Sequence, residues 1–538
     1  MSVFTFDAKA GNPVTTDTIV SLANELGVKE HTQIELEQYK TLLAVFHDAC
    51  EELDEMDDYL PEVDYERFPR KDPYFPQPED NKLGAWGYKC EVKDLKYTGG
   101  GLLDGSNIAV KDCIAIAGVP MLLGTNFVKD YVPKTDAVVI TRLMEAGATI
   151  QGKAVCENLC HSATSHSAGT GPVHNPLAIG YSTGGSSSGS AALVMDPEED
   201  IDITIGADQG GSVRIPAGWC GAVGLKPTFG LIPFTGCAGN EATNDHLGVL
   251  TRDVLTNAKG LQAIAGSDGI DDRSFGAQTS DYYYDLLDLS DPKCLKGLKI
   301  AILKEGFENR AVEQRVKDTC LAAIKKFKEL GATVEEVSIP LHSKGALIWT
   351  GVSKIGGYLT KMGNNIGRRG VSLNDLTQKF LEAAHTQENW DQAYPSSKNI
   401  YYNGMYAEKK FPGLYGKCTN LSRKLRDSYN KVLEEYDLIV LPNLPYIARS
   451  HAEIGPNATP LELIGKQVGL SSNTAPFDQS GHPALALPVG MLPILEGPLA
   501  DSGTKLPVSL QIVGQWFDEK TVYRAAYAFE KSYNWKDL

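Results

Sequence analysis

Hydrophobic residues near the start of the chain recur at alternating spacings of three and four, the period of one face of an α-helix. This stripe consists of Leu36, Tyr39, Leu43, Phe46, Cys50 and Leu53. It predicts helices within residues 17–58, and the run of prolines between positions 61 and 78 predicts an extended connector on the body of the protein. We therefore expect residues 1–85 to form an N-terminal helical extension with a proline-rich connector. The stripe suits two roles equally, contact with a second copy in a homodimer or packing on the chain's own body.

The pattern changes near residue 95, where short apolar runs begin to alternate with amphipathic stretches. The runs that predict strands are SNIAVK, ATIQGKA, LKIAIL, ATVEEVSI, LIVLP, ALALPVG and VSLQIVG. Helices are expected at residues 135–147, 310–330 and 519–532, and a glycine ends each of the first two. This alternation indicates an α/β fold over residues 86–538, with a mixed, mainly parallel central sheet covered by helices on both faces. Residues 340–435 are helix-rich and predict a lobe over the site.

Composition and charge narrow the class of protein. Acidic residues outnumber basic ones, 68 to 51, so the formal net charge is -17. Such a field repels nucleic acid and anionic membranes. No apolar run approaches the roughly 18 residues of a membrane-spanning helix, and the first residues lack the pattern of a secretory signal. The ten cysteines are scattered, which favours free thiols in a reducing compartment. We expect a cytoplasmic enzyme that binds neither nucleic acid nor membrane.

Two glycine-rich segments carry the candidate chemistry. Residues 180–190 read GYSTGGSSSGS, and this stretch lies between strand-forming segments, where a flexible linker is out of place. The second segment, DQGGS, follows a short strand and puts Ser212 behind two glycines. Glycine lets the backbone approach a substrate closely. The N–H groups of Gln209, Gly210, Gly211 and Ser212 can converge on one point, as an oxyanion hole requires.

A nucleophilic serine needs a base, and the residues alone leave more than one choice. The segment from Gly185 to Gly189 matches the G-x-S-x-G elbow of α/β-hydrolases, with Ser187 as nucleophile and His482 as base. A phosphate-binding loop is excluded because no lysine follows the glycines. Cys156, Cys160 and His161 suggest a zinc site, but no second ligand pair follows at a suitable spacing. We therefore expect no metal.

The ordered motifs resemble the amidase-signature hydrolases. The segments GYSTGGSSSGSAALV and GADQGGSVRIPAGWCGAVGLKPTFG carry the resemblance, together with NIAVKDCIAIAGVP before them and NTAPFDQSGHPALALPVGM after them. GKAVCENLCHS and SGTGPVHNPL are similar to the corresponding segments of nitrile-hydratase-associated acylamidases and urethanases. The resemblance covers about residues 90–535 and implies the amidase-signature fold without a cofactor.

The resemblance also implies roles for individual residues. Lys111 matches the catalytic lysine, Ser186 the bridging serine on a cis peptide bond, and Ser212 the nucleophile. Arg214 and Asp245 match charged residues that support the site from behind. The chain departs from the family pattern in two places, because Ser188 stands where a glycine is common and the acidic insert DPEED precedes the nucleophile segment.

The implied reaction is hydrolysis of small or medium amides to a carboxylate and ammonia through an acyl-enzyme, with carbamates (urethanes) and esters as further substrates. A lysine with a pKa near about 10.4 is protonated at neutral pH. We therefore expect burial to lower the pKa of Lys111 so that it acts as a base. The alternative is the amidase subunit of a tRNA-dependent transamidation complex, which needs partner subunits. The CENLC segment and the N-terminal helices favour a self-sufficient homodimer.

Overall fold

The computed structural model describes residues 5–28, 31–128, 130–287, 289, 291, 294–363, 368–383, 386–455 and 458–538. The chain divides into two compact units, Met1–Pro61 and Glu62–Leu538. The division therefore precedes the proline-rich connector, which we had grouped with the helices up to residue 85. The connector belongs to the larger unit because Arg70 and Tyr74 form antiparallel bridges with Val92 and Lys89.

The smaller unit is a pair of helices, α1 (Thr16–Glu25) and α2 (Gln33–Asp54). Each begins with a capping box, in which Thr15 or Thr32 satisfies N–H groups of the first turn. Within this unit α1 does not fully cover the predicted apolar stripe of α2, since Phe46 is 63% exposed and Leu53 is 67% exposed. The stripe is thus covered only in part by the described residues of its unit, since Leu36 and Leu43 are half-buried and Tyr39 packs against His31.

The larger unit is built on an eleven-stranded sheet. Its strands are β1 (Trp86–Val92), β2 (Asn107–Lys111), β3 (Thr149–Ala154), β6 (Ile203–Asp208), β7 (Val223–Lys226), β8 (His246–Thr251), β9 (Lys299–Leu303), β10 (Thr333–Val337), β11 (Leu438–Pro442), β12 (Ala484–Pro493) and β13 (Lys505–Gly514). Their order is β1-β3-β2-β6-β8-β7-β12-β13-β11-β9-β10. A separate pair consists of β4 (His174–Asn175) and β5 (Ala178–Ser182).

The predicted mixed α/β sheet is confirmed, but parallel pairs do not predominate. β3, β2 and β6 run parallel at one end, and β11, β9 and β10 run parallel at the other. The neighbours between them, from β6 to β11, are all antiparallel. At the parallel ends, α3 connects β2 to β3 and α9 connects β9 to β10, whereas the antiparallel centre joins strands from distant parts of the chain, such as β7 and β12.

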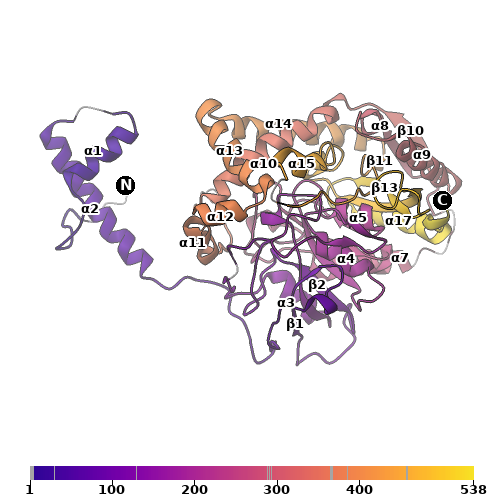
Figure 1. Ribbon diagram of the computed structural model, residues 1–538, viewed down its shortest axis with the longest axis horizontal. Coiled ribbons are helices and arrows are strands. Elements are labelled where there is room, and N and C mark those ends of the chain that lie inside the picture. Colours follow the sequence, from indigo (N-terminus) through magenta and orange to yellow (C-terminus); the bar gives the residue numbers. More distant parts are fainter. Residues whose placement is uncertain are drawn as a thin grey trace. The chain divides into compact units, whose positions relative to one another are not determined.

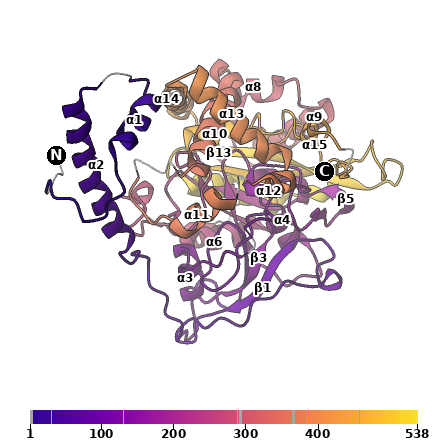
Figure 2. The ribbon, with the colours of Figure 1, turned by 60° about the vertical axis from the view of Figure 1, so that its left-hand side comes forward.

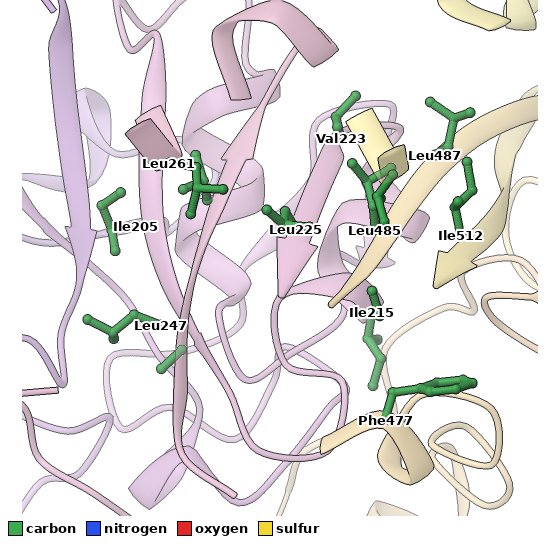
Figure 3. Packing of buried hydrophobic residues seen from close by; sticks show 14 of the residues in the cluster. Ile205, Ile215, Val223, Leu225, Leu247, Leu261, Phe477, Leu485, Leu487 and Ile512 are labelled. Carbon is green, nitrogen blue, oxygen red and sulfur yellow. The ribbon is translucent and has the colours of Figure 1, made fainter. Parts of the chain in front are cut away.

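Helices cover both faces of this sheet (Figure 1). The α-helices of the larger unit up to the lobe are α3 (Val138–Glu145), α4 (Ser188–Met195), α5 (Arg214–Cys220), α6 (Val254–Ile264), α7 (Tyr282–Leu287), α8 (Lys304–Glu308) and α9 (Gln314–Glu329). The last helix is α17 (Glu519–Ser532). On one face α4 and α5 pack together, and on the other α17 contacts both α6 and α9. Figure 3 shows Ile215 of α5 beside Leu485 of β12 and Phe477 in this packing.

Residues 340–435 hold the helices of the predicted lobe. They are α10 (Gly345–Lys361), α11 (Asn374–Ala383), α12 (Gln387–Gln392), α13 (Pro395–Lys410) and α14 (Leu414–Leu433). α15 (Pro460–Gly465) and α16 (Ala475–Ser480) follow. α10 contacts α13, α14 and α16, and Figure 2 shows it among the other helices of the lobe. None of the helices that the structure describes is both long enough and apolar enough to cross a membrane.

Candidate active site

The three predicted catalytic residues approach one edge of the sheet. Lys111 is the last residue of β2, and Ser212 lies in the turn between β6 and α5. β2 and β6 are parallel neighbours, so their carboxyl ends meet at the same edge. Ser186 lies in the loop between β5 and α4. Lys111 Nζ donates a hydrogen bond to Ser186 Oγ at 2.7 Å and another to the carbonyl of Ala207 at 3.2 Å.

The two serine loops are held side by side. The Gly185–Ser186 peptide bond is cis, as the sequence resemblance implied. Ser187 N donates to the carbonyl of Ser212 at 3.3 Å. Lys111 and Ser186 are fully buried, whereas Ser212 is half-buried and lies on the wall of a cavity of about 80 Å³. Ser186 is thus already linked to the lysine, while Ser212 faces the space a substrate would enter.

Asp208, at the end of β6, organises the turn that carries Ser212. Its carboxylate accepts hydrogen bonds from Gly211 N at 2.6 Å and Val213 N at 3.0 Å. The N–H of Gly211 is therefore bonded within the turn, and the four-donor oxyanion hole predicted from sequence is corrected to three candidates. Gln209, Gly210 and Ser212 keep N–H groups that have no acceptor within the described part of the chain.

Gly211 is required by its surroundings as well as by its conformation. Its φ is +124°, in a region that side chains disfavour, and a Cβ there would meet Thr474 Oγ1 at 2.3 Å. Thr474 Oγ1 donates to the carbonyl of Gly210 at 2.7 Å. Trp349 Nε1 donates to the carbonyl of Gln209 at 2.5 Å. The turn is therefore fixed from three sides, by β6, by α10 and by the residue before α16.

Arg214 lies fully buried behind the turn that carries Ser212. Its guanidinium bonds both oxygens of Asp208, at 2.9 and 3.0 Å, and Asp478 Oδ2 at 2.7 Å. It also donates to the carbonyl of Thr474 and to Gln511 Oε1. Although burial opposes ionisation, the charge of Arg214 holds the pKa of Asp208 far below its usual range. Burial and the nearby charge of Asp208 raise the pKa of Asp478 well above its ordinary value.

Asp245 supports a different part of the site. Its carboxylate accepts hydrogen bonds from Asn240 N, at 3.1 and 3.2 Å, and from Glu241 N at 3.2 Å. Asn240 and Glu241 line the cavity beside Ser212. Asp245 therefore shapes the cavity wall, whereas Arg214 shapes the turn of the nucleophile candidate.

The electrostatic surroundings of Lys111 differ from expectation. Burial disfavours its ammonium form, but the pKa of Lys111 is nevertheless raised, with nearby Cys160 the largest opposing influence. The neighbouring thiols of Cys113 and Cys156 lower the pKa of Cys160 well below its usual range. A thiolate there stabilises a positive charge on Lys111. The predicted lowering of the Lys111 pKa is therefore wrong in its net direction, because the sequence did not reveal this cluster.

The alternative serine–histidine pair is not assembled. Ser187 Oγ is buried and donates to the carbonyl of Ala207 at 3.2 Å. The two ring nitrogens of His482 contact Ser480 Oγ and Asn430 Oδ1, each at 2.9 Å. Both side chains are thus engaged in separate structural contacts. Across the described residues no group of three His, Cys, Asp or Glu side chains is arranged to hold a metal ion.

Sequence reasoning missed Asp208, Asp478 and Trp349. Asp208 had a readable signal, since it is a carboxylate at the end of an apolar strand and directly before the glycine-rich turn. Asp478 and Trp349 come from segments far along the chain, and nothing in the sequence linked them to this turn. Ser188, the departure from the family pattern, contacts the carbonyl of Val155 and Glu157 Oε1, so the extra hydroxyl has partners.

Comparison with known proteins gives consistent matches along this chain. The sequence profile of the family described as "Amidase" matches residues 90–523. An enantioselective amidase of Rhodococcus rhodochrous is 36% identical over 460 residues, which cover 85% of this chain and 84% of the relative. A glutamyl-tRNA(Gln) amidotransferase subunit of Exiguobacterium sibiricum is 36% identical over 433 residues, covering 80% and 84%.

Solved structures show the same architecture. One subunit of the glutamyl-tRNA(Gln) amidotransferase of Thermotoga maritima has a TM-score of 0.62 at 26% identity, with 82% of this chain and 86% of that chain covered. The peptide amidase of Stenotrophomonas maltophilia has a TM-score of 0.63 at 24% identity, with 80% and 83% covered.

Proposed function

The chain belongs to the amidase family of hydrolases that act on C–N bonds, and on that premise we propose that it is a serine amidase. Its substrates are small or medium amides, which it converts to a carboxylate and ammonia through an acyl-enzyme. Ser212 is the nucleophile, and Ser186 and Lys111 form the proton relay. The observation that carries this proposal is the 2.7 Å hydrogen bond between Lys111 Nζ and Ser186 Oγ, next to a cavity lined by Ser212.

In this mechanism Ser212 attacks the amide carbonyl carbon as its proton passes to Ser186 Oγ, and the proton of Ser186 passes to neutral Lys111. The relay then returns a proton to the leaving nitrogen as the C–N bond breaks. Water, activated by the same relay, releases the acid from Ser212. The half-buried position of Ser212 on the cavity wall supports its role, because a substrate in the cavity can reach its side chain.

The negative charge that develops on the carbonyl oxygen is stabilised by the N–H groups of Gln209, Gly210 and Ser212. Their amides lack other acceptors among the described residues, and the bonds from Trp349 and Thr474 keep the turn in place. Preorganised donors of this kind are typically worth about 10²–10³-fold in rate each.

Lys111 must lose its proton before it can act as a base. Burial is the largest single influence on the pKa of Lys111 and lowers it, but Cys160, Cys113, Cys156 and Asp208 together raise it above its ordinary value. The neutral form thus becomes more populated as pH rises. We therefore expect activity to increase toward alkaline pH. Carbamates and esters enter the same cavity as further substrates, since both present a carbonyl beside a leaving group.

A second candidate is supported by the amidotransferase relative, which is as similar in identity as the enantioselective amidase. In that case the chain is the amidase subunit of a tRNA-dependent transamidation complex and needs partner subunits. We favour the self-sufficient enzyme, a cytoplasmic homodimer formed through the exposed part of the apolar stripe of α2. Purification alone separates the two, because only the self-sufficient enzyme retains full amide hydrolysis without a partner.

The direct test is ammonia release from benzamide, propionamide and ethyl carbamate by the wild type and by Ser212→Ala. The proposal predicts hydrolysis of at least one of these by the wild type and none by the variant. Thr474→Val serves as a matched comparison, because it removes one hydroxyl that fixes the turn but leaves the relay intact. Full activity in Ser212→Ala would exclude Ser212 as nucleophile.

A further inference from the structure

Helix α10 brings two lysines to the site. Lys354 lines the same cavity as Ser212. Lys361 lies two turns further along the helix and lines a neighbouring cavity of about 120 Å³. Cys160 and Asn240 line both cavities, so the two spaces adjoin. Residues seven apart lie on the same face of a helix, and this face of α10 is turned toward the reaction site.

Neither lysine has a carboxylate partner in the part of the chain that the structure describes. Lys361 Nζ donates to Asn240 Oδ1 at 2.9 Å and lies 5.4 Å from the centre of the Phe380 ring. Lys354 has no hydrogen bond to any described residue, and burial lowers its pKa to about 8. Lys354 is half-buried on the cavity wall, whereas full burial lowers the pKa of Lys361 and its negative neighbours Cys160 and Asp245 oppose that shift. Lys354 is therefore the less compensated of the two lysines.

The one acidic side chain on the wall of the Ser212 cavity is already engaged. Among the described lining residues, Glu241 accepts hydrogen bonds from Thr243 N, Thr243 Oγ1 and Tyr415 Oη. No ion pair joins Glu241 to Lys354 within these described residues. Lys354 is therefore a positively charged group on the cavity wall without a carboxylate partner among the described residues, although Cys160 lines the same cavity.

Other polar groups around the cavity also lack acceptors. Gln209 Nε2, Asn244 Nδ2 and His161 Nε2 are buried and have no hydrogen-bond partner in the described part of the chain. Gln209 is 8% exposed and Asn244 is 1% exposed, and all three residues line the cavity. Burying a donor without an acceptor is costly unless a ligand supplies one. A hydrocarbon substrate would leave these donors unmatched, whereas oxygen atoms would pair with them.

We propose that this cavity selects amides that carry a carboxylate at the end remote from the scissile bond, the half-amides of short dicarboxylic acids. The carboxylate pairs with Lys354, the unmatched amide donors bind its oxygens, and Lys361 extends the preference to longer chains. This inference rests on the proposed amidase function. Lys354 is a specificity-determining residue in this scheme, since it touches the remote end of the substrate and not the reacting atoms.

The test compares succinamate with 4-methylpentanamide, in which an isopropyl group of similar shape replaces the carboxylate. Values of kcat and KM are measured for the wild type, Lys354→Met, Lys354→Arg and Lys344→Met. Lys344 is an exposed lysine at the start of the same helix and is the matched control. We expect the wild type to prefer succinamate, and Lys354→Met to reduce the ratio of the two kcat/KM values by about 30-fold or more, mainly through KM.

Lys354→Arg should retain part of the preference, and Lys344→Met should keep the wild-type ratio. A wild type that hydrolyses 4-methylpentanamide as well as succinamate overturns this inference and leaves the amidase proposal standing. If Lys354→Met lowers kcat/KM equally for both substrates, the inference is also overturned, because the lysine would then act on folding or on the reaction itself. A wild type that hydrolyses neither compound, nor any simple amide, overturns both proposals.

Discussion

Two buried carboxylates share the guanidinium of Arg214, and we expect their replacement by amides to have unequal effects on stability. Asp208 accepts hydrogen bonds from Gly211 N, Val213 N and Arg214. Its pKa is held far below the usual range, so it is ionised. Asp478 bonds only one nitrogen of Arg214, and its raised pKa favours the protonated acid.

The magnitudes follow from these protonation states. Removing one partner of a buried ion pair costs about 3–5 kcal/mol. We expect the low end, about 3 kcal/mol of unfolding free energy, for Asp208→Asn because Asp478 can then ionise in its place. Asp478→Asn exchanges a neutral acid for a neutral amide, so it breaks no ion pair and should not lower the unfolding free energy.

The pH dependence has opposite signs at the two positions. The folded pKa of Asp208 lies below its unfolded value, so its contribution is present at neutral pH and is lost only as pH falls through the folded pKa. The folded pKa of Asp478 lies above its unfolded value of about 3.9. Its ionisation in the unfolded state therefore weakens folding as pH rises above that value, and Asp478→Asn removes this penalty.

Urea unfolding followed by circular dichroism at pH 7 measures both changes, with exposed Asp427→Asn as the control. The account predicts a much lower midpoint for Asp208→Asn and an equal or higher midpoint for Asp478→Asn. If Asp478→Asn lowered the unfolding free energy as much as Asp208→Asn or more, the assignment of the negative charge to Asp208 would be refuted.

Three further predictions concern the reaction. Lys111→Met and Ser186→Ala should each lower kcat by about 10²–10⁴-fold in steady-state assays, while circular dichroism shows an unchanged fold. Cys160→Ala should move the rising limb of the profile of kcat/KM against pH to lower pH, because loss of the Cys160 charge lowers the pKa of Lys111. A rising limb at the wild-type pH would show that Cys160 does not influence the pKa of Lys111. Gly211→Ala should lower the unfolding free energy by about 1–3 kcal/mol and also reduce kcat, since the new Cβ meets Thr474. An unchanged melting temperature together with an unchanged kcat would show that the turn accommodates the methyl group.

Much of the fold was predictable because local patterns encode local structure. Each of the seven predicted apolar runs contains a strand, and the last helix has the expected bounds, Glu519–Ser532. β7 and β8 were missed because VGLK and HLGVLT lie in a glycine-rich region without a clear alternation. The direction of strand pairing was also wrong at the centre of the sheet, since a strand's own sequence does not specify its neighbour.

The site was predictable to the extent that its residues lie in contiguous motifs. The link between Lys111 and Ser186 joins motifs 75 residues apart, and only the resemblance to a family connected them. Asp478 reaches Arg214 across 264 residues, and Trp349 reaches the turn from 140 residues away. The cysteine cluster beside Lys111 likewise exists only in the folded chain, which is why the pKa of the lysine was predicted in the wrong direction.

Covalent labelling tests the central claim, that Ser212 is the nucleophile, most directly. Wild type, Ser212→Ala and Ser187→Ala are treated with a sulfonyl fluoride, digested, and analysed by peptide mass spectrometry. The account predicts one modified peptide, labelled at Ser212, in the wild type and in Ser187→Ala, and no active-site label in Ser212→Ala. A label on Ser187, or one that persists in Ser212→Ala together with amidase activity, would contradict it.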